Sequence, residues 1–135
     1  MGADQLKRIH RVRTLQLTLA RADEARAHAQ AATEQALSAR IAQLADAVAP
    51  TSGSAVSLLA QSRYRERLHQ SAQTAANRVR MAEADVVRAA EGARAAKRDQ
   101  SAVEKLLERA CLEALRREMR ALEDQPATRK RHDPC

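Results

Sequence analysis

The sequence predicts an all-α protein in which two long helices form an antiparallel coiled-coil hairpin, the second helix longer than the first. One basis is composition, because the 135 residues include 31 alanines and a single aromatic residue, Tyr64. Alanine buries little apolar area, so these side chains cannot build the thick core of a globular domain. A second basis is the small number of helix-breaking residues, three glycines and three prolines. The third is an apolar heptad repeat in the second half of the chain.

The first predicted helix covers about residues 4–48. Its apolar residues recur at helical spacing, which predicts one face turned toward a partner helix. Asp4 is the expected N-terminal cap, and the alanine-rich interior has a high helix propensity. The predicted stripe consists of Ile9, Val12, Leu15, Leu19, Ala22, Ala25, Ala29, Ala32 and Ala36, followed after a small phase shift by Leu37, Ile41, Leu44 and Val48.

The segment APTSGSA, residues 49–55, predicts the bend between the helices. Pro50 cannot continue the first helix, Gly53 can adopt a positive φ, and Ser54 can cap the second helix. A connection as short as residues 49–54 makes two long helices antiparallel neighbours.

The second predicted helix covers about residues 55–124 and has the most regular pattern of the chain. Steps that alternate between four and three residues define a seam, and 13 of its 14 positions are apolar. Such a 3.5-residue repeat keeps one seam facing a partner helix and imposes a left-handed supercoil. The seam positions are Leu68, Ala72, Ala75, Val79, Ala82, Val86, Ala89, Ala93, Ala96, Gln100, Val103, Leu107, Ala110 and Ala114.

The unequal lengths of the helices predict an apolar surface without an internal partner. Tight pairing around the bend places residue 4 near residue 99, so that residues 101–124 project beyond the first helix. Exposed stripes of this kind usually mark a binding surface; the alternative is a homodimer in which two such segments cover each other. The stripe comprises Val103, Leu106, Leu107, Leu112, Leu115, Met119 and Leu122. Residues 125–135 are expected to be a disordered basic tail outside this single domain of residues 1–124.

The net charge of +7 raises the possibility of nucleic-acid binding, but the charge distribution argues against it. Lysine and arginine outnumber aspartate and glutamate only by 7 to 5 in residues 1–48 and by 14 to 11 in residues 55–124. Both signs are interleaved along the helices, as on solvated coiled-coil faces. Local basic clusters occur at Leu6–Arg13 and Arg129–His132. We expect no nucleic-acid partner.

The sequence contains no pattern for catalysis, for a cofactor or for a metal site. The four histidines lack partners at metal-ligand spacing, neither cysteine belongs to a CxxC pair, and there is no Gly-rich phosphate loop. Two helices alone also enclose no pocket that would exclude water. The protein is therefore predicted not to be an enzyme and to need no cofactor.

The cysteines and the hydropathy predict a cytoplasmic protein that does not insert into a membrane. Cys111 and Cys135 form no disulfide framework, pairing between them looks strained, and they are expected to be reduced thiols. No stretch approaches the roughly 20 apolar residues of a membrane span, and the N-terminus lacks the apolar core of a secretion signal.

Both ends of the helical region resemble a known family. The opening LKRIHRVR, with Leu6, Ile9, His10, Val12 and Arg13, resembles the start of the YscO proteins of bacterial type III secretion systems. The ending AVEKLLERACLEALRREMRALEDQ is similar to the far end of YscO and of its flagellar counterpart FliJ. A phenylalanine usual near the start of flagellar members is absent, so the injectisome branch fits better. The matching positions at the ending are Glu104, Lys105, Leu106, Glu108, Arg109, Glu123 and Asp124.

The resemblance implies a stalk protein similar to the central shaft of rotary ATP synthases. Such a protein inserts its terminal end into the hexameric export ATPase and connects it to the export gate; secretion chaperones are possible further partners. The resemblance implies gate or chaperone docking near the bend, where the candidates are Tyr64 and Leu68. The implied ATPase-binding residues are Leu6, Lys7, Arg8, Ile9, Arg11, Val12, Arg13, Val103, Leu106, Leu107, Arg109, Leu112, Leu115, Met119 and Leu122.

Other functions remain open from the sequence alone. The exposed stripe could hold secretion chaperones as an escort, or the chain could be a generic coiled-coil adaptor or a weak homodimer unrelated to secretion. A nucleic-acid binder is the least favoured alternative. The expected location is the cytoplasm, peripheral at the secretion apparatus.

Overall fold

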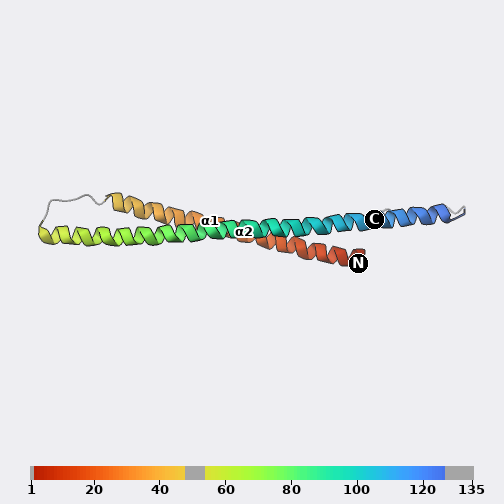
Figure 1. The fold of residues 1–135 in the computed structure, drawn as a ribbon, viewed down its shortest axis with the longest axis horizontal. Helices are drawn as coiled ribbons and strands as arrows, with labels where there is room; N and C mark the ends of the chain where they lie inside the picture. Colours follow the sequence, from red (N-terminus) through yellow and green to blue (C-terminus); the bar gives the residue numbers. More distant parts are fainter. Residues whose placement is uncertain (1, 48–53, 127–135) are drawn as a thin grey trace. The chain divides into compact units, whose positions relative to one another are not determined.

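The computed structural model describes residues 2–47 and 54–126. Within these residues the chain forms two helices, α1 (Ala3–Ala47) and α2 (Ala55–Asp124), and no strand (Figure 1). The prediction of an all-α fold with two long helices, the second longer, is confirmed. The predicted bend at Pro50 and Gly53, and nearly all of the predicted tail, lie outside the described residues.

The two predicted helix caps differ in outcome. The hydroxyl oxygen of Ser54 accepts a hydrogen bond from the backbone N–H of Ser57 at 3.4 Å, which confirms Ser54 as the N-cap of α2. Helix α1 begins one residue earlier than predicted, because the carbonyl of Gly2 already accepts a hydrogen bond from the N–H of Leu6 at 3.2 Å. Asp4 is therefore not the cap. It lies in the first turn, where a carboxylate is favourable near the positive end of the helix dipole.

Contacts between residues divide the chain into two compact units, and both helices run through both. The terminal unit consists of Met1–Ala20 and Ala93–Cys135, and the central unit consists of Arg21–Gly92. Each therefore pairs a piece of α1 with a piece of α2.

Within each unit the two helical pieces run antiparallel. In the terminal unit, His10 contacts Glu104 and Arg13 contacts Asp99, so residue numbers rise along α1 as they fall along α2. In the central unit, the side chain of Gln35 donates a hydrogen bond to Glu83 at 3.2 Å. Further along α1 in that unit, Ala45 lines one groove with Leu68 and Ala72 of α2, which continues the antiparallel order.

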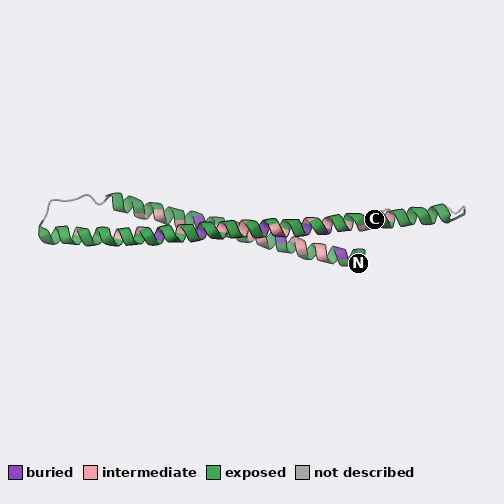
Figure 2. Cartoon of the chain, viewed as in Figure 1, coloured by how far each residue is buried: buried purple, intermediate pink, exposed green. Residues whose placement is uncertain are grey.

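The heptad seam of α2 is the face that packs against α1. Of its 14 predicted positions, every one except Ala114 is buried or half-buried (Figure 2). The most deeply buried members are Ala75, Ala82, Ala93 and Val103. The regular 3.5-residue repeat thus identified the packed face of α2 correctly.

The packed face of α1 differs from the predicted one. Leu15 and Leu19 of the predicted stripe are each 64% exposed, whereas Leu17 is only 4% exposed and Leu6 is 6% exposed. The residues that turn toward α2 follow their own alternating four-and-three spacing, and all of them are buried or half-buried. This observed line is Leu6, His10, Arg13, Leu17, Ala20, Glu24, Ala27, Ala31, Glu34, Ser38 and Ile41.

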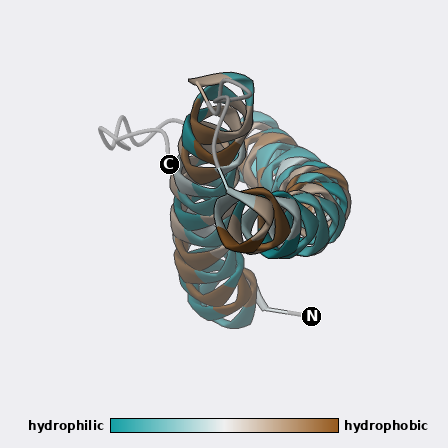
Figure 3. Ribbon diagram, turned by 90° about the vertical axis from the view of Figure 1, so that its left-hand side faces the viewer, coloured by the Kyte–Doolittle hydropathy of each residue, from teal (hydrophilic) through white to brown (hydrophobic). Residues whose placement is uncertain are grey.

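The sequence prediction for α1 was wrong because it counted only apolar residues. The observed line contains five polar or charged residues, and two of these, His10 and Arg13, find partners on α2 within the terminal unit. Alanine occurs on every face of α1, so it cannot distinguish the packed face from the exposed one. Figure 3 shows hydrophobic and hydrophilic residues interspersed along both helices.

The pairing register also differs from the predicted one. Tight pairing around the bend would place residue 4 near residue 99, but Glu104 contacts His10 at 3.2 Å and Val103 is buried. Residues 55–60 at the start of α2 are all exposed in the central unit. The part of α2 without a partner on α1 is thus divided between its two ends. The projecting C-terminal segment is consequently shorter than residues 101–124.

One prediction about the cysteines is wrong. Cys111 of α2 is disulfide-bonded, and no cysteine in the described part of the chain is free. Two cysteines were too few to predict a disulfide framework, but the absence of a framework does not exclude a single disulfide. Cys135 lies outside the described residues. In residues 2–47 and 54–126, neither helix has a segment with the length and apolarity needed to cross a membrane.

Candidate interaction surface

The terminal unit carries an apolar stripe on α2 that has no counterpart on α1. Because His10 contacts Glu104, the same antiparallel register brings Ala3, the first residue of α1, to the level of Cys111. Helix α2 continues from there to Asp124. The side chains of this extension that share one face, at spacings of three and four, are called the C-terminal stripe: Leu112, Leu115, Met119 and Leu122.

The C-terminal stripe is open to solvent. Leu112 is 53% exposed and Met119 is 55% exposed, and Leu122 is exposed as well. Leu115 between them is half-buried. A row of large apolar side chains left in water on a helix that is otherwise rich in charge is the usual mark of a contact surface.

Charged residues border the C-terminal stripe on one side. Glu113, Arg116, Arg117 and Arg120 together line a shallow groove on α2. At 100° per residue, Arg116 lies next to the stripe and the other three continue around the helix from it. Arg116 beside the apolar stripe, with Arg120 next to it, favours a partner surface that is apolar with a carboxylate at its border.

The predicted ATPase-binding residues of α1 do not all reach the surface. Leu6 is buried, and Ile9 and Arg13 are half-buried. The remaining four are exposed: Lys7, Arg8, Arg11 and Val12. The basic and apolar stretch at the N-terminus is therefore split between the packed face and the outer face of α1.

The predicted residues of α2 divide in the same way. Val103 is buried and Leu107 is half-buried, both in the seam against α1. Leu106 and Arg109 are exposed. The structure thus leaves the C-terminal stripe, Leu106 and Arg109 available for a partner on this helix.

A second exposed stripe, on α1, was mistaken for a packing face in the sequence. Val12, Leu15 and Leu19, here called the outer stripe, are all more than half exposed. At 100° per residue they lie on the opposite side of α1 from Leu6 and Leu17. The spacing that predicted them was correct for a helix face; only the identity of the face was wrong.

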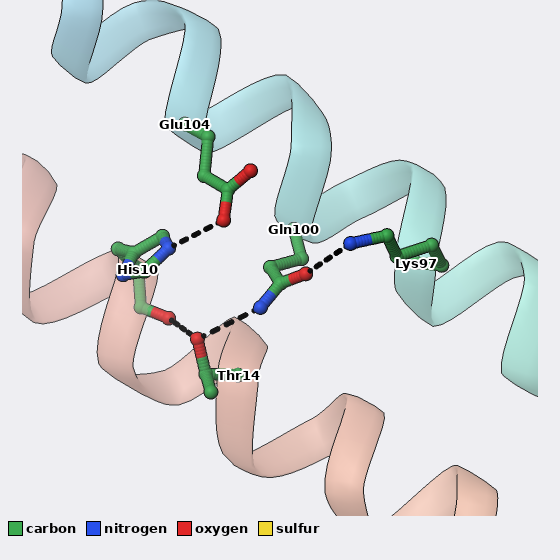
Figure 4. Close-up of polar contacts among 5 residues, drawn as sticks. All are labelled: His10, Thr14, Lys97, Gln100 and Glu104. Atoms are coloured by element: carbon green, nitrogen blue, oxygen red, sulfur yellow. Dashed lines mark hydrogen bonds and ion pairs between the residues drawn. The ribbon is translucent and has the colours of Figure 1, made fainter.

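A cluster of polar side chains joins the two helices within the terminal unit (Figure 4). The Nε2 atom of His10 lies 3.2 Å from Oε1 of Glu104. Gln100 donates a hydrogen bond to the hydroxyl of Thr14 at 3.2 Å and accepts one from the Lys97 ammonium at 3.1 Å. These five residues are called the polar cluster.

The backbone also takes part in the polar cluster. The Thr14 hydroxyl donates to the carbonyl of His10 at 2.9 Å, so this hydroxyl both donates and accepts. Gln100 is only 8% exposed, and it is the one buried polar side chain in the described part of the chain. Because its amide oxygen and its amide nitrogen both have partners, its burial leaves neither atom of the amide unpaired.

The predicted gate-docking residues lie in the central unit and face different surroundings. Tyr64 is 48% exposed and lines a shallow groove with Val56 and Leu59. Leu68 is half-buried and lines another groove beside Ala45 of α1. Tyr64 is thus open to a partner, whereas α1 partly covers Leu68.

Val56 and Leu59 are candidate contact residues that the sequence analysis did not single out. Both are more than half exposed and lie beside Tyr64. A signal was present in the sequence, because these apolar residues precede Leu68, where the heptad seam begins. Large apolar residues outside a seam have no packing role within it, so they indicate a possible contact surface.

The described residues contain no group of three or more histidine, cysteine, aspartate or glutamate side chains placed to hold a metal ion. The chain matches no protein-family model. It also has no significant match among characterised proteins or among solved structures.

Proposed function

We propose that this chain is a stalk component of a bacterial type III secretion export apparatus. In this proposal the terminal unit binds the hexameric export ATPase and promotes its assembly and activity, while the other end contacts the export gate or secretion chaperones. The support comes from the resemblance of both helix ends to YscO and FliJ proteins, together with the fold of two long helices of unequal length.

The observation that carries the proposal is the exposed C-terminal stripe. Four large apolar side chains lie on one face of α2 beyond the first residue of α1, so among the described residues α1 does not reach them. Full burial of one such side chain contributes about 1.5–3 kcal/mol. Burial of the stripe against a partner would therefore contribute several kcal/mol, which offsets part or all of the cost of association.

The structure changes which residues are proposed for the contact. Leu6 and Val103 already pack inside the terminal unit, so a partner cannot bury them further. We assign the contact to the C-terminal stripe with Leu106 and Arg109, and on α1 to the exposed residues Lys7, Arg8, Arg11 and Val12.

This arrangement suggests how a stalk can act without catalytic groups. Alanine occupies much of the seam, so the helices form a narrow pair with small side chains between them. Binding energy concentrated at one end allows such a pair to hold ATPase subunits together and to bias their cycle. The hydrolytic chemistry stays in the ATPase.

Docking at the export gate or on chaperones is assigned to the exposed group of Val56, Leu59 and Tyr64. These residues lie near the start of α2 and line one shallow groove. Leu68 takes part only through its uncovered side, since it is half-buried. Replacing Tyr64 with serine should weaken capture of the gate's cytoplasmic domain and leave ATPase binding unchanged; unchanged gate capture would remove this assignment.

A cytoplasmic location, peripheral at the secretion apparatus, is the part of the proposal that the disulfide at Cys111 opposes. Disulfides are rare in the reducing cytoplasm. The location therefore turns on whether this disulfide is present in living cells. Alkylation of free thiols at the moment of cell lysis measures this, and a Cys111 that stays unmodified until a reductant is added would contradict the location.

The test of ATPase binding compares two double variants of the full chain. Leu112→Glu with Met119→Glu places two charges in the C-terminal stripe. Leu58→Glu with Leu59→Glu changes two comparably exposed apolar residues elsewhere on α2. Affinity for the purified hexameric export ATPase of the same organism is measured by fluorescence anisotropy on labelled chain.

The stripe variant should bind about 100-fold more weakly, which corresponds to a loss of roughly 3 kcal/mol. The control variant should bind like the native chain. Equal weakening in both variants, or none in either, would refute the assignment to the C-terminal stripe.

Self-association is the second candidate function, and the same exposed apolar residues favour it. Two copies could cover their C-terminal stripes with each other, as a generic coiled-coil adaptor would. Sedimentation equilibrium of the native chain and the stripe variant separates the two cases. A tight native dimer that becomes monomeric in the stripe variant would favour self-association over ATPase binding.

A further inference from the structure

The apolar seam of α2 does not by itself define one pairing register. Along one edge of the seam, alanine recurs every seven residues. A displacement of α1 by seven residues therefore brings alanine to a position that alanine has just left, with nearly the same packing. This repeated set is Ala75, Ala82, Ala89 and Ala96, with Val103 and Ala110 continuing it.

Alanine is also too small to interlock strongly with side chains across a helix pair. Close packing discriminates between alternatives when large and small side chains alternate, because a misplaced large residue leaves a void or a clash. Among the described residues of the terminal unit, the large apolar residues that are buried are Leu6, Leu17 and Val103. Apolar packing alone therefore does not select one register, and other contacts must do so.

Three polar pairs in the terminal unit supply such contacts. They are His10 with Glu104, Arg13 with Asp99 at 3.3 Å, and Thr14 with Gln100. All three lie within about one turn of each other on α1, and their partners lie within about one turn and a half on α2. Gln100 is the single polar residue among the 14 seam positions of α2.

Displacement by one heptad in either direction removes all three pairs together. The residues brought to the same level are Lys97 or Cys111 for His10, Gly92 or Leu106 for Arg13, and Ala93 or Leu107 for Thr14. None of these six supplies a carboxylate or an amide oxygen from its side chain. In a displaced register the Gln100 amide oxygen would keep Lys97, but its amide nitrogen would lose Thr14, and a buried donor without an acceptor is costly.

We propose that these three polar pairs are a register lock, which selects one antiparallel alignment of α1 and α2 where the alanine seam would accept several. A buried glutamine at position 100 stabilises the helix pair less than an apolar residue would, but it makes the alternative alignments unfavourable. Arg13 and Asp99 are each partly exposed, so their pair adds little to the free energy of unfolding and acts mainly by favouring the native alignment.

The register is measured by pulsed electron paramagnetic resonance on the full chain. Spin labels are attached to p-acetylphenylalanine placed at Thr18 and Glu108, two exposed positions in the terminal unit, so the native cysteines stay untouched. A displacement of seven residues moves one label by about 10 Å along the helix axis. Each register therefore gives its own distance.

Two variants separate a register lock from a general contribution to stability. The variant His10→Leu, Arg13→Ala, Gln100→Leu removes all three pairs and keeps the buried leucines. The variant Leu17→Ala keeps the three pairs and removes a buried apolar side chain. Both are compared with the native chain by thermal unfolding and by the distance between the labels.

The native chain and Leu17→Ala should each show one distance, and Leu17→Ala should unfold at a lower temperature. The triple variant should unfold no earlier than the native chain and should show at least one additional distance. A single unchanged distance in the triple variant would overturn the register lock. Loss of helix or earlier unfolding in the triple variant would overturn it too, because the pairs would then supply stability and not alignment.

Discussion

Gly92 lowers the stability of α2 without an evident packing reason. It lies in the helix interior, and a Cβ atom added there would meet nothing within 4 Å. Glycine in a helix interior costs about 1 kcal/mol relative to alanine. Gly92→Ala should therefore raise the free energy of unfolding by about 0.5–1 kcal/mol, measured by urea unfolding followed by circular dichroism. A lower free energy of unfolding would mean that the helix needs glycine at this position for bending.

Capping shows how far single residues could be predicted. Ser54 follows a proline and a glycine, so few other positions could begin α2, and its hydroxyl does cap the helix. Asp4 is equally suited to capping by residue type, but the backbone of Gly2 starts the helix first. Residue type alone does not decide between neighbouring start positions.

At the scale of the helices, the difference between α1 and α2 explains what the sequence could predict. Helix α2 has one seam with 13 apolar positions, so its packed face was predictable. Helix α1 has two candidate faces: one contains leucine and valine but is exposed, and the other mixes leucine with charged residues and packs. The second becomes recognisable only when its polar partners on α2, such as Glu104, are known.

Two leucines of α1 test which face packs. Leu17 is 4% exposed and Leu15 is 64% exposed, although both are leucines two residues apart in the same helix. Leu17→Ala should lower the free energy of unfolding by about 2–3 kcal/mol, because it removes buried methyl groups. Leu15→Ala should change it by less than about 0.5 kcal/mol. Chemical unfolding of both variants measures the difference, and a larger loss for Leu15→Ala would restore the face predicted from the sequence.

For the whole molecule, the fold class and the unequal helices were predictable, whereas the register was not. The register depends on how many residues of α2 pass the end of α1, and the predicted tight bend gave no means to place the six exposed residues 55–60. The prediction therefore placed Val103 in the projecting segment, although it is buried. The projecting segment did include the C-terminal stripe, because these residues lie past the first residue of α1 in both the predicted and the observed register.

The proposed function also belongs to this scale, since it depends on one end of the chain being free to bind. Hydrogen–deuterium exchange along α2, with and without the hexameric export ATPase, tests this most directly. In the free protein, amides of residues 112–124 should exchange much faster than those of residues 96–104, and the ATPase should slow residues 112–124 selectively. Equal protection of both segments in the free monomer, or no change at residues 112–124 when the ATPase is added, would contradict the account.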